Sequence, residues 1–365
     1  MPLSRVANQG LTGPIGGRRN VVTNGLMNVA QRATSATGLG ASDGFFTVDR
    51  FKMLFNNTAG RLTMEQVADG PSGFANAIKL SCTTADTSIA ADEFAVIEQR
   101  LEGQDLQRFM KGTSDAKEYA LSFYVKGNAS ATYVIELYDN DNNRQVSKQF
   151  SVTTSWSRVE LIFPADTTGA FDDDANTSLI IFFWLHAGSD RTSGTLSETW
   201  TSVTNANRAV GINSFFSSTD NTFFVTGLQL EVGSVATEFE HRSFGEELAL
   251  CQRYFIRYPS LADGSVNLYY ALGMIHSSTT AFYHVNLPVP MRTQPDLSIS
   301  GADDFTSVDS GTIRNLTNLT LLGDLFIDEK AVVLQGTATF SNEDRPSMLR
   351  GDGTSGGHFA LDAEL

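Results

Sequence analysis

The 365-residue chain has few cysteines, few prolines and little charge. Cys82 and Cys251 stand far apart and form no CxxC pair, which predicts two buried thiols, although a single disulfide stays open. Charged residues make up 18% of the chain and the formal net charge is −15. The only basic cluster is Arg18-Arg19, and binding nucleic-acid phosphates needs many more clustered Lys and Arg side chains. We therefore expect no nucleic-acid partner.

Long hydrophobic runs are also missing. No apolar stretch approaches the length of about 18 residues that a membrane-spanning helix needs, and no secretory hydrophobic segment follows Met1. We expect neither membrane insertion nor export. The longest apolar stretch, residues 179–185, suits a buried central strand. Internal repeats of 20–50 residues are absent, which disfavours a solenoid or a β-helix.

What the chain has instead is Ser, Thr, Asn and Gly between short alternating runs, a composition that favours strands and turns. Residues 119–125 place four apolar side chains on one face at a period of two. Further strands are predicted at 132–138, 146–152, 158–163, 179–186, 209–216 and 222–231. Many short strands at roughly 10-residue spacing predict a mainly β fold, an antiparallel sandwich of the jelly-roll type.

A helix is predicted after this sandwich. Ser243 and Glu246 have the S-x-x-E spacing of a capping box, and a helix over residues 244–256 would follow. Its apolar stripe would consist of Leu248, Cys251, Tyr254 and Phe255. Beyond Pro259 a second, smaller β domain is expected, with strands at 266–275, 280–287, 296–300, 325–327, 331–334 and 337–340. The predicted organisation is an extended arm (1–20), the jelly roll (21–243), a connecting helix (244–256) and a C-terminal β domain (257–365).

Two oxygen-rich turns are candidate sites for a hard cation. One contains Asp139 and Asp141, the other Asp172 and Asp174. Calcium takes six to eight oxygen ligands, but neither turn has the glycine and distal glutamate of an EF-hand, so solvated hairpin turns are the favoured interpretation. The five histidines show no HxH or HExxH spacing, so we expect no zinc site and a simply packed His186 at the end of its strand. No other cofactor is predicted.

Catalytic motifs are not recognisable either. GxSxG, P-loop and GxGxxG patterns are missing from any strand–turn–helix context, and no Asp or Glu pair stands in an evident acid–base setting. We expect no enzymatic activity. Trp156, Trp200 and Tyr138 are candidate carbohydrate or receptor contacts, because sugar rings stack on exposed aromatic faces. The alternative for the tryptophans is a place in the core or in a protein interface. The pairs Tyr269-Tyr270 and Phe282-Tyr283 would each put one ring on either face of a strand.

The run at residues 225–254, VTGLQLEVGSVATEFEHRSFGEELALCQRY, resembles a signature of virion fibre and appendage proteins of tailed bacteriophages. Other stretches are similar to the same type of protein: FTVDR at 46–50, IEQRLE at 97–102, YALSFYVK at 119–126, GSDRTSGTLSETW at 188–200, LPVPMR at 287–292, Pro295 and DAEL at 362–365. Together these matches cover most of the chain after residue 20.

The resemblance implies a structural protein of the virion, on the tail or the capsid surface, that assembles in the host cytoplasm. It implies a homotrimer whose helices pack about a threefold axis, with residues 1–20 attached to other virion proteins. The expected function is non-catalytic adhesion to a host surface glycan or protein, with weak sites strengthened by avidity. Jelly rolls of the similar carbohydrate-binding kind often hold a structural calcium. A capsid decoration or head-fibre protein is the alternative, and a glycan-cleaving tail enzyme is a third hypothesis.

Overall fold

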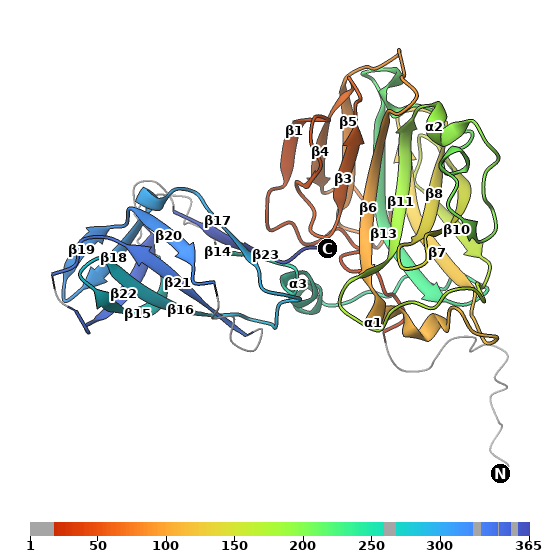
Figure 1. Cartoon of the computed structure of the whole chain (residues 1–365). Helices are drawn as coiled ribbons and strands as arrows, with labels where there is room; N and C mark the ends of the chain where they lie inside the picture. Colours follow the sequence, from red (N-terminus) through yellow and green to blue (C-terminus); the bar gives the residue numbers. More distant parts are fainter. Residues whose placement is uncertain (1–17, 259–267, 324–329, 342, 352–356) are drawn as a thin grey trace, which may run out of the picture. The chain divides into compact units, whose positions relative to one another are not determined.

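The computed structural model describes residues 18–258, 268–323, 330–341, 343–351 and 357–365 (Figure 1). These residues form two compact units with a boundary between Glu247 and Leu248. Both units consist mainly of antiparallel β-sheet, as predicted. No helix within the described ranges is both long enough and apolar enough to cross a membrane. Cys82 and Cys251 are both buried free thiols, as the sequence predicts.

The first unit is a sandwich of two sheets of the jelly-roll type (Figure 1). The six-stranded sheet has the order β1 (Ser35–Leu39), β4 (Arg61–Val67), β5 (Ala77–Thr84), β13 (Thr222–Val232), β7 (Tyr119–Gly127), β10 (Ser157–Phe163). The seven-stranded sheet has the order β12 (Thr201–Ser202), β9 (Arg144–Val152), β8 (Ala131–Asp139), β11 (Thr177–Ala187), β6 (Phe94–Glu102), β3 (Lys52–Asn56), β2 (Gly44–Phe45). Short helical segments lie between strands: α1 (Gly103–Leu106), η2 (Gln107–Phe109), α2 (Ser189–Thr192), η3 (Asn205–Asn207), η4 (Phe215–Ser217).

Hydrophobic alternation explains how these strands pack. Leu121, Phe123 and Val125 of β7 are fully buried between the two sheets, on the face that their spacing predicts. The central strand β11 is apolar on both faces, and other parts of the chain cover each face. Its residues Ile181 and Phe183 enter the main core, whereas Ile180, Phe182 and Trp184 belong to a second cluster on the outer face.

The prediction of a strand at residues 209–216 is wrong. This segment is a loop that ends in η4, because its backbone groups bond outside any ladder. The amide of Ala209 donates to the carbonyl of Arg191 at 2.9 Å, and that of Asn213 donates to the carbonyl of Thr132 at 2.8 Å. Ala209 and Phe215 are buried apolar residues of this loop, and their spacing in the sequence resembles the alternation of a strand.

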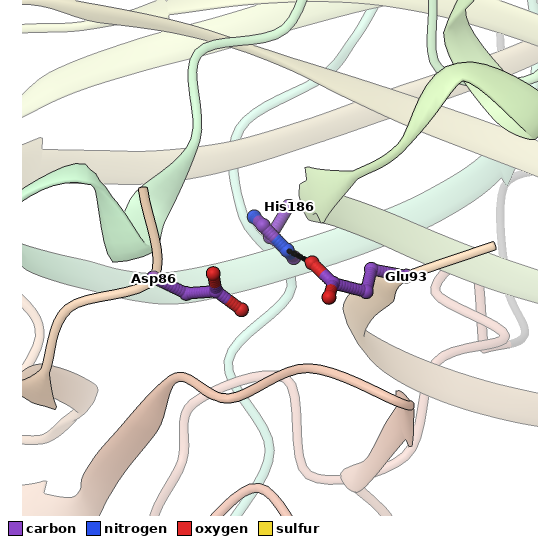
Figure 2. Close-up of side chains that lie close together, drawn as sticks. All are labelled: Asp86, Glu93 and His186. Atoms are coloured by element: carbon purple, nitrogen blue, oxygen red, sulfur yellow. Dashed lines mark ion pairs between the residues drawn. The ribbon is translucent and has the colours of Figure 1, made fainter. Parts of the chain in front are cut away.

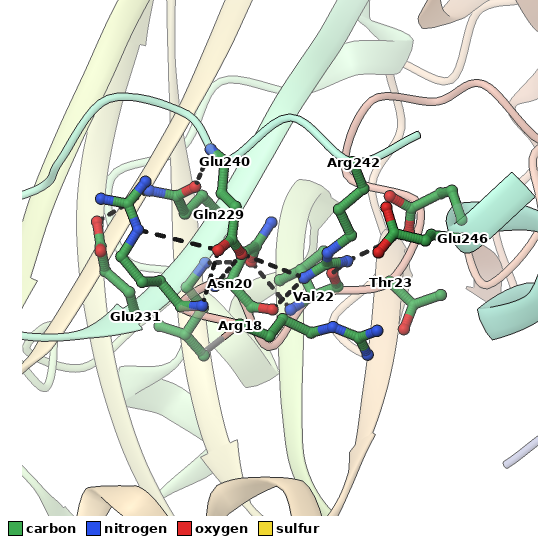
Figure 3. Close-up of polar contacts among 12 residues, drawn as sticks. Arg18, Asn20, Val22, Thr23, Gln229, Glu231, Glu240, Arg242 and Glu246 are labelled. Atoms are coloured by element: carbon green, nitrogen blue, oxygen red, sulfur yellow. Dashed lines mark hydrogen bonds and ion pairs between the residues drawn. The ribbon is translucent and has the colours of Figure 1, made fainter. Parts of the chain in front are cut away.

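The end of the predicted N-terminal arm belongs to the first unit. Residues 1–17 lie outside the described residues, but Asn20 is 1% exposed. Its side chain donates to the carbonyl of Leu228 at 3.1 Å and accepts from the amide of Leu230 at 3.0 Å. The amides of Arg19 and Asn20 donate to the two carboxylate oxygens of Glu240 at 3.0 and 2.9 Å (Figure 3). The arm therefore cannot extend to residue 20 as predicted, since Asn20 continues the hydrogen bonding of β13.

Asn20, Gln229, Glu231, Glu240 and Arg242 form what we call the N-terminal network (Figure 3). Gln229 is fully buried, donates to Glu231 at 2.9 Å and accepts from the amide of Glu240 at 2.8 Å. Arg242 donates to the backbone carbonyl of Asn20 and contacts Glu240 at 3.7 Å. The run at residues 225–254 thus provides most of a polar network that holds residues 19 and 20 against β13.

The predicted capping box is confirmed. The Ser243 amide donates to the Glu246 carboxylate at 3.1 Å, and the Glu246 amide donates to the Ser243 hydroxyl at 3.3 Å. The helix α3 (Phe244–Gln252) is shorter than predicted and ends four residues before Ile256. The chain turns where the Tyr254 amide bonds to the carbonyl of Cys251, and Phe255 then begins a strand.

The second unit has two antiparallel sheets. The larger has the order β19 (Thr312–Asn315), β18 (Phe305–Asp309), β22 (Pro346–Gly351), β15 (Tyr269–Ser277), β16 (Thr280–Asn286), β21 (Ala331–Thr337), β20 (Asn318–Leu321). The smaller has the order β14 (Phe255–Tyr258), β23 (Phe359–Asp362), β17 (Asp296–Ile299), and η5 (Ala302–Asp304) precedes β18. The strands predicted at 331–334 and 337–340 are one strand, β21, which ends at Thr337. The strand predicted at 325–327 and the first two residues of the one predicted at 266–275 lie outside the described residues.

A substitution at Gly227 tests how β13 is packed. It lies at a register shift in β13 with φ +64°, and a Cβ there would approach Phe74 Cε1 to 2.7 Å and Tyr124 Cδ2 to 3.0 Å. We expect Gly227→Ala to lower the free energy of unfolding of the first unit by about 1–3 kcal/mol, through left-handed strain and contact with the two rings. Urea unfolding followed by tryptophan fluorescence reports on this unit, because the three tryptophans, Trp156, Trp184 and Trp200, all lie in it.

Gly245 provides the control for this substitution. It lies in α3, and a Cβ at this position meets no atom within 4 Å. Gly245→Ala should therefore leave the unfolding midpoint unchanged or raise it, since alanine favours helix. Equal destabilisation by both substitutions would contradict the packing described for Gly227.

Candidate functional site

The three aromatic residues predicted to contact a glycan do not share a surface. Trp200 packs against the main core, tilted on Tyr119 at a ring distance of 5.7 Å, and its Nε1 donates to the carbonyl of Pro164 at 2.8 Å. Trp156, next to β10, lies against Phe224 and under Lys126, whose Nζ is 5.2 Å from the ring centroid. Tyr138 lies on the outer face of the seven-stranded sheet.

That outer face is closed by the chain itself. The guanidinium of Arg208 lies about 5 Å from three ring centroids, those of Tyr138, Phe182 and Trp184 (5.1, 5.3 and 5.0 Å). It also donates to the fully buried carboxylate of Glu136 at 2.9 Å, which accepts from Trp184 Nε1 at 2.7 Å. A cation already lies over these three rings, so their faces are not open for a sugar ring to stack on them.

The two oxygen-rich turns lie side by side in the structure. The amide of Asp172 donates to the carboxylate of Asp141 at 3.0 Å, and the side chain of Asn142 donates to the carbonyl of Ala170 at 2.8 Å. Asp174 instead accepts bonds from Asn176, two residues along the chain. Their proximity, which spacing alone does not reveal, brings carboxylate and carbonyl oxygens together.

A lysine ammonium occupies the centre of this group of oxygens. Lys111 Nζ lies 2.6 Å from Asp139 and 3.1 Å from Asp166, and it donates to the carbonyls of Thr168 and Gly169 at 2.8 and 2.7 Å. The Lys111 and Asp139 side chains are fully buried. Burial raises the pKa of Asp139, and the lysine offsets this only in part. Asp139 is thus bound to a cation that the chain itself supplies, and calcium there stays an untested prediction.

The second unit contains a hollow with exposed aromatic lining. Its volume is about 430 Å³, and its walls include Tyr258, Tyr269, Tyr270, Leu272, His284 and Asn286, which we call the aromatic hollow. Leu272 is 73% exposed and Tyr269 is 54% exposed. Single exposed apolar residues are common in proteins, but several that converge on one concavity are typical of a binding site.

Two of these tyrosines are held rigidly. Tyr258 stacks on Phe359 at a centroid distance of 4.4 Å and an angle of 17°, and its hydroxyl donates to the carbonyl of Asn286 at 3.2 Å. Tyr270 meets the same Phe359 edge-on at 5.3 Å. Burial raises the pKa of Tyr258 and of Tyr270 to about 12, so both hydroxyls stay protonated at neutral pH. The described lining of the hollow includes no Asp or Glu.

A separate cluster in the first unit has the composition of a metal site. Asp86 follows β5, Glu93 immediately precedes β6, and His186 lies near the end of β11; their ligand atoms lie within 4.8 Å of one another (Figure 2). A bulge between Trp184 and His186 in the pairing of β11 with β6 turns the imidazole inward, edge-on to Phe216. Sequence spacing could not reveal this cluster, which we call the Asp–Glu–His cluster.

The four residues predicted to line a trimer interface are mostly buried in this chain. Cys251, Tyr254 and Phe255 are 0%, 4% and 5% exposed, and Leu248 is half-buried. Phe255 pairs with Asp362 in the smaller sheet, and Tyr254 accepts a backbone bond from Ala363. Their helical spacing reflects internal packing of these residues, while a role in trimer formation stays a prediction.

No protein-family model matches the chain, and no curated protein matches its sequence at a significant level. Solved structures with some similarity include the family 11 carbohydrate-binding module of Clostridium thermocellum with a mixed-linked tetrasaccharide, at 14% identity over 57% of this chain and 99% of that one, with a TM-score of 0.29. A family 30 carbohydrate-binding module has 11% identity over 62% and 93%, with a TM-score of 0.31.

The enzymatically active domain of tailspike protein 4 from bacteriophage CBA120 has 10% identity and a TM-score of 0.30. The alignment covers 59% of this chain but only 21% of that chain. Such low identities and TM-scores do not assign a family, a ligand or an activity to the chain.

The buried lysine at the two turns can be tested directly. Lys111→Met leaves Asp139 and Asp166 buried without their shared cation, and we expect a loss of about 3–5 kcal/mol in the free energy of unfolding of the first unit. Urea unfolding followed by tryptophan fluorescence measures it. Lys117→Met is the matched control, because Lys117 is exposed and should change stability by less than about 0.5 kcal/mol. Equal stability of the two variants would show that the buried pair contributes nothing.

Proposed function

We propose that this chain is a non-catalytic attachment protein of a tailed-phage virion, a homotrimeric fibre whose second unit binds a glycan of the host surface. The observation that supports this function most directly is the aromatic hollow. Exposed Tyr269, with the fixed rings of Tyr258 and Tyr270, provides the apolar faces on which sugar rings stack. His284 and Asn286 add polar atoms that can meet sugar hydroxyls.

A hollow this open would bind one saccharide weakly. Three copies on one fibre would present three identical sites, and simultaneous contact raises the overall affinity by orders of magnitude without any new interaction. The proposed trimer therefore has a functional reason as well as the sequence resemblance. The closed outer face in the first unit, which Arg208 covers, supports recognition through the second unit instead.

An exposed apolar surface in the second unit supports association between copies of this chain. One row of directly paired residues lies on three strands and consists of Ile313, the buried Val308 and Met348. Beside it lies a second row: Pro346, Met274, Phe282 and Gln335. Paired residues project from the same side of a sheet, so the two rows form one surface, which we call the apolar rows.

The lack of charged side chains in the apolar rows favours a second copy of this chain as the partner that binds them. Neither row contains Asp, Glu, Lys or Arg, whereas the whole chain has a net charge of −15. Two copies that meet here avoid placing carboxylates against carboxylates. Ile313 and Met274 are 54% and 50% exposed in the single chain, so a contact would remove apolar area from water.

The glycan site predicts the effect of one substitution. Tyr269→Ala removes the most accessible ring of the aromatic hollow, and we expect at least about tenfold weaker binding per site to bacterial surface polysaccharides. Binding is measured on a glycan array and by competition for phage adsorption to host cells. Because Tyr269 is 54% exposed, the variant should unfold at the wild-type temperature.

Ile89→Ala is the control, because Ile89 is 41% exposed in the first unit and far from the hollow in sequence. Unchanged adsorption by Tyr269→Ala would exclude the hollow as the attachment site. Antibody labelling of virions tests the location separately. Gold particles over the head would favour the capsid decoration or head-fibre alternative over a tail fibre.

Association between copies predicts a different effect. Met274→Asp places a charge in the apolar rows, and we expect the particle mass to fall from three times 39.6 kDa to that of one chain. Light scattering after size-exclusion chromatography measures the mass. Val235→Asp, at a 61% exposed position in the first unit, should remain trimeric. A monomeric wild-type chain, or a trimeric Met274→Asp variant, would refute this interface.

A further inference from the structure

The Asp–Glu–His cluster contains two buried polar atoms that lack a hydrogen-bond partner. His186 Nδ1 lies 2.8 Å from the hydroxyl oxygen of Ser214, while His186 Nε2 and Glu93 Oε2 have no partner and lie 3.5 Å apart. His186 is fully buried and Glu93 is 6% exposed. With Nδ1 donating to Ser214, Nε2 presents its lone pair to a carboxylate oxygen. Buried polar atoms in proteins almost always have partners, so a cation, a proton or an ordered water is expected between them.

The third residue makes the site negatively charged. Asp86 accepts bonds from the Thr58 hydroxyl at 3.0 Å, the Ala59 amide at 2.8 Å and the Ser88 amide at 3.3 Å. Three donated hydrogen bonds favour the charged form of a carboxylate, so Asp86 brings a negative charge to the cluster.

Among the described residues, neither Asp86 nor Glu93 forms a salt bridge with a lysine or an arginine, and the ion-pair partner of Glu93 is His186 at 3.5 Å. The cluster therefore differs from the buried carboxylates Asp139 and Glu136, which are paired with Lys111 and Arg208.

The backbone fixes the cluster in place. The amide of Asp86 donates to the carbonyl of Phe216 at 2.8 Å, and the amide of Gly188 donates to the carbonyl of Glu93 at 2.8 Å. A Cβ at position 188 would lie 1.9 Å from the carbonyl oxygen of Ala90, so only glycine permits this approach. The three side chains thus project from segments that are held together without any ligand.

We propose that Asp86, Glu93 and His186 bind a divalent transition-metal ion such as zinc. An imidazole nitrogen with two carboxylate oxygens is a donor set for zinc rather than for calcium or magnesium, which prefer oxygen alone. Ligands of one zinc ion lie at most about 4 Å apart, so atoms within 4.8 Å of one another need only small side-chain rotations to reach it. The ion would join the segment before β6 to the end of β11.

Calorimetric titration of the chelator-treated full chain with zinc sulfate tests this proposal. We expect one zinc ion per chain, a higher melting temperature with zinc, and no effect of calcium or magnesium at equal concentration. Cobalt in place of zinc should give a visible absorption spectrum typical of nitrogen and oxygen ligands. No heat and no thermal shift with zinc would overturn the proposal and leave a protonated Glu93 as the partner of His186.

Glu93→Gln separates metal binding from folding. The glutamine has the shape of glutamate and can donate its amide proton to His186 Nε2, so the metal-free variant should melt at or above the wild-type temperature. Its zinc affinity should fall at least tenfold. His241→Gln removes an exposed histidine and should bind zinc like the wild type. Wild-type zinc affinity in Glu93→Gln would assign the ion to surface residues and refute this site.

Discussion

The buried N-terminal network is the constraint on which the first unit depends. Alternation along β13 places Leu228 and Leu230 in the core, so Gln229 and Glu231 must face the other way. That side would leave an amide and a carboxylate buried, and the chain satisfies both with Thr237 and Glu240. The docked Asn20 bonds the backbone of β13 at Leu228 and Leu230. Because unpaired buried polar groups are costly, the segment that follows β13 and the one at residues 19–24 cannot move independently.

The first unit repeatedly neutralises its own buried carboxylates. Lys111 lies between Asp139 and Asp166, and Arg208 pairs with Glu136 beneath three aromatic rings. Both arrangements occupy positions where an external cation or ligand could otherwise bind. The Asp–Glu–His cluster is the exception among these three groups, since neither of its carboxylates forms a salt bridge with a described lysine or arginine. A site for an external ion is therefore expected where internal compensation fails.

The second unit, in contrast, leaves apolar side chains exposed on one face of its larger sheet. Its larger sheet buries Tyr283, Val285 and Leu349 on one face and exposes Leu272 and Met274 on the other. Such a surface suits contacts that a single chain does not make. The aromatic hollow takes its lining from both sheets of this unit, from Tyr258 of β14 as well as from Tyr269 and Tyr270 of β15.

The sequence alone determined the mainly β fold, the central strand β11 and the capping box of α3, because each depends on local periodicity or local spacing. It also pointed to Tyr269 and Tyr270 as paired rings on opposite faces of a strand. Only the tertiary structure decided that Trp200 belongs to the core, that Lys111 lies among the oxygens of two turns, and that residues 209–216 form a loop. It alone brought Asp86, Glu93 and His186 together. These outcomes depend on contacts between segments far apart in the chain, which no local pattern encodes.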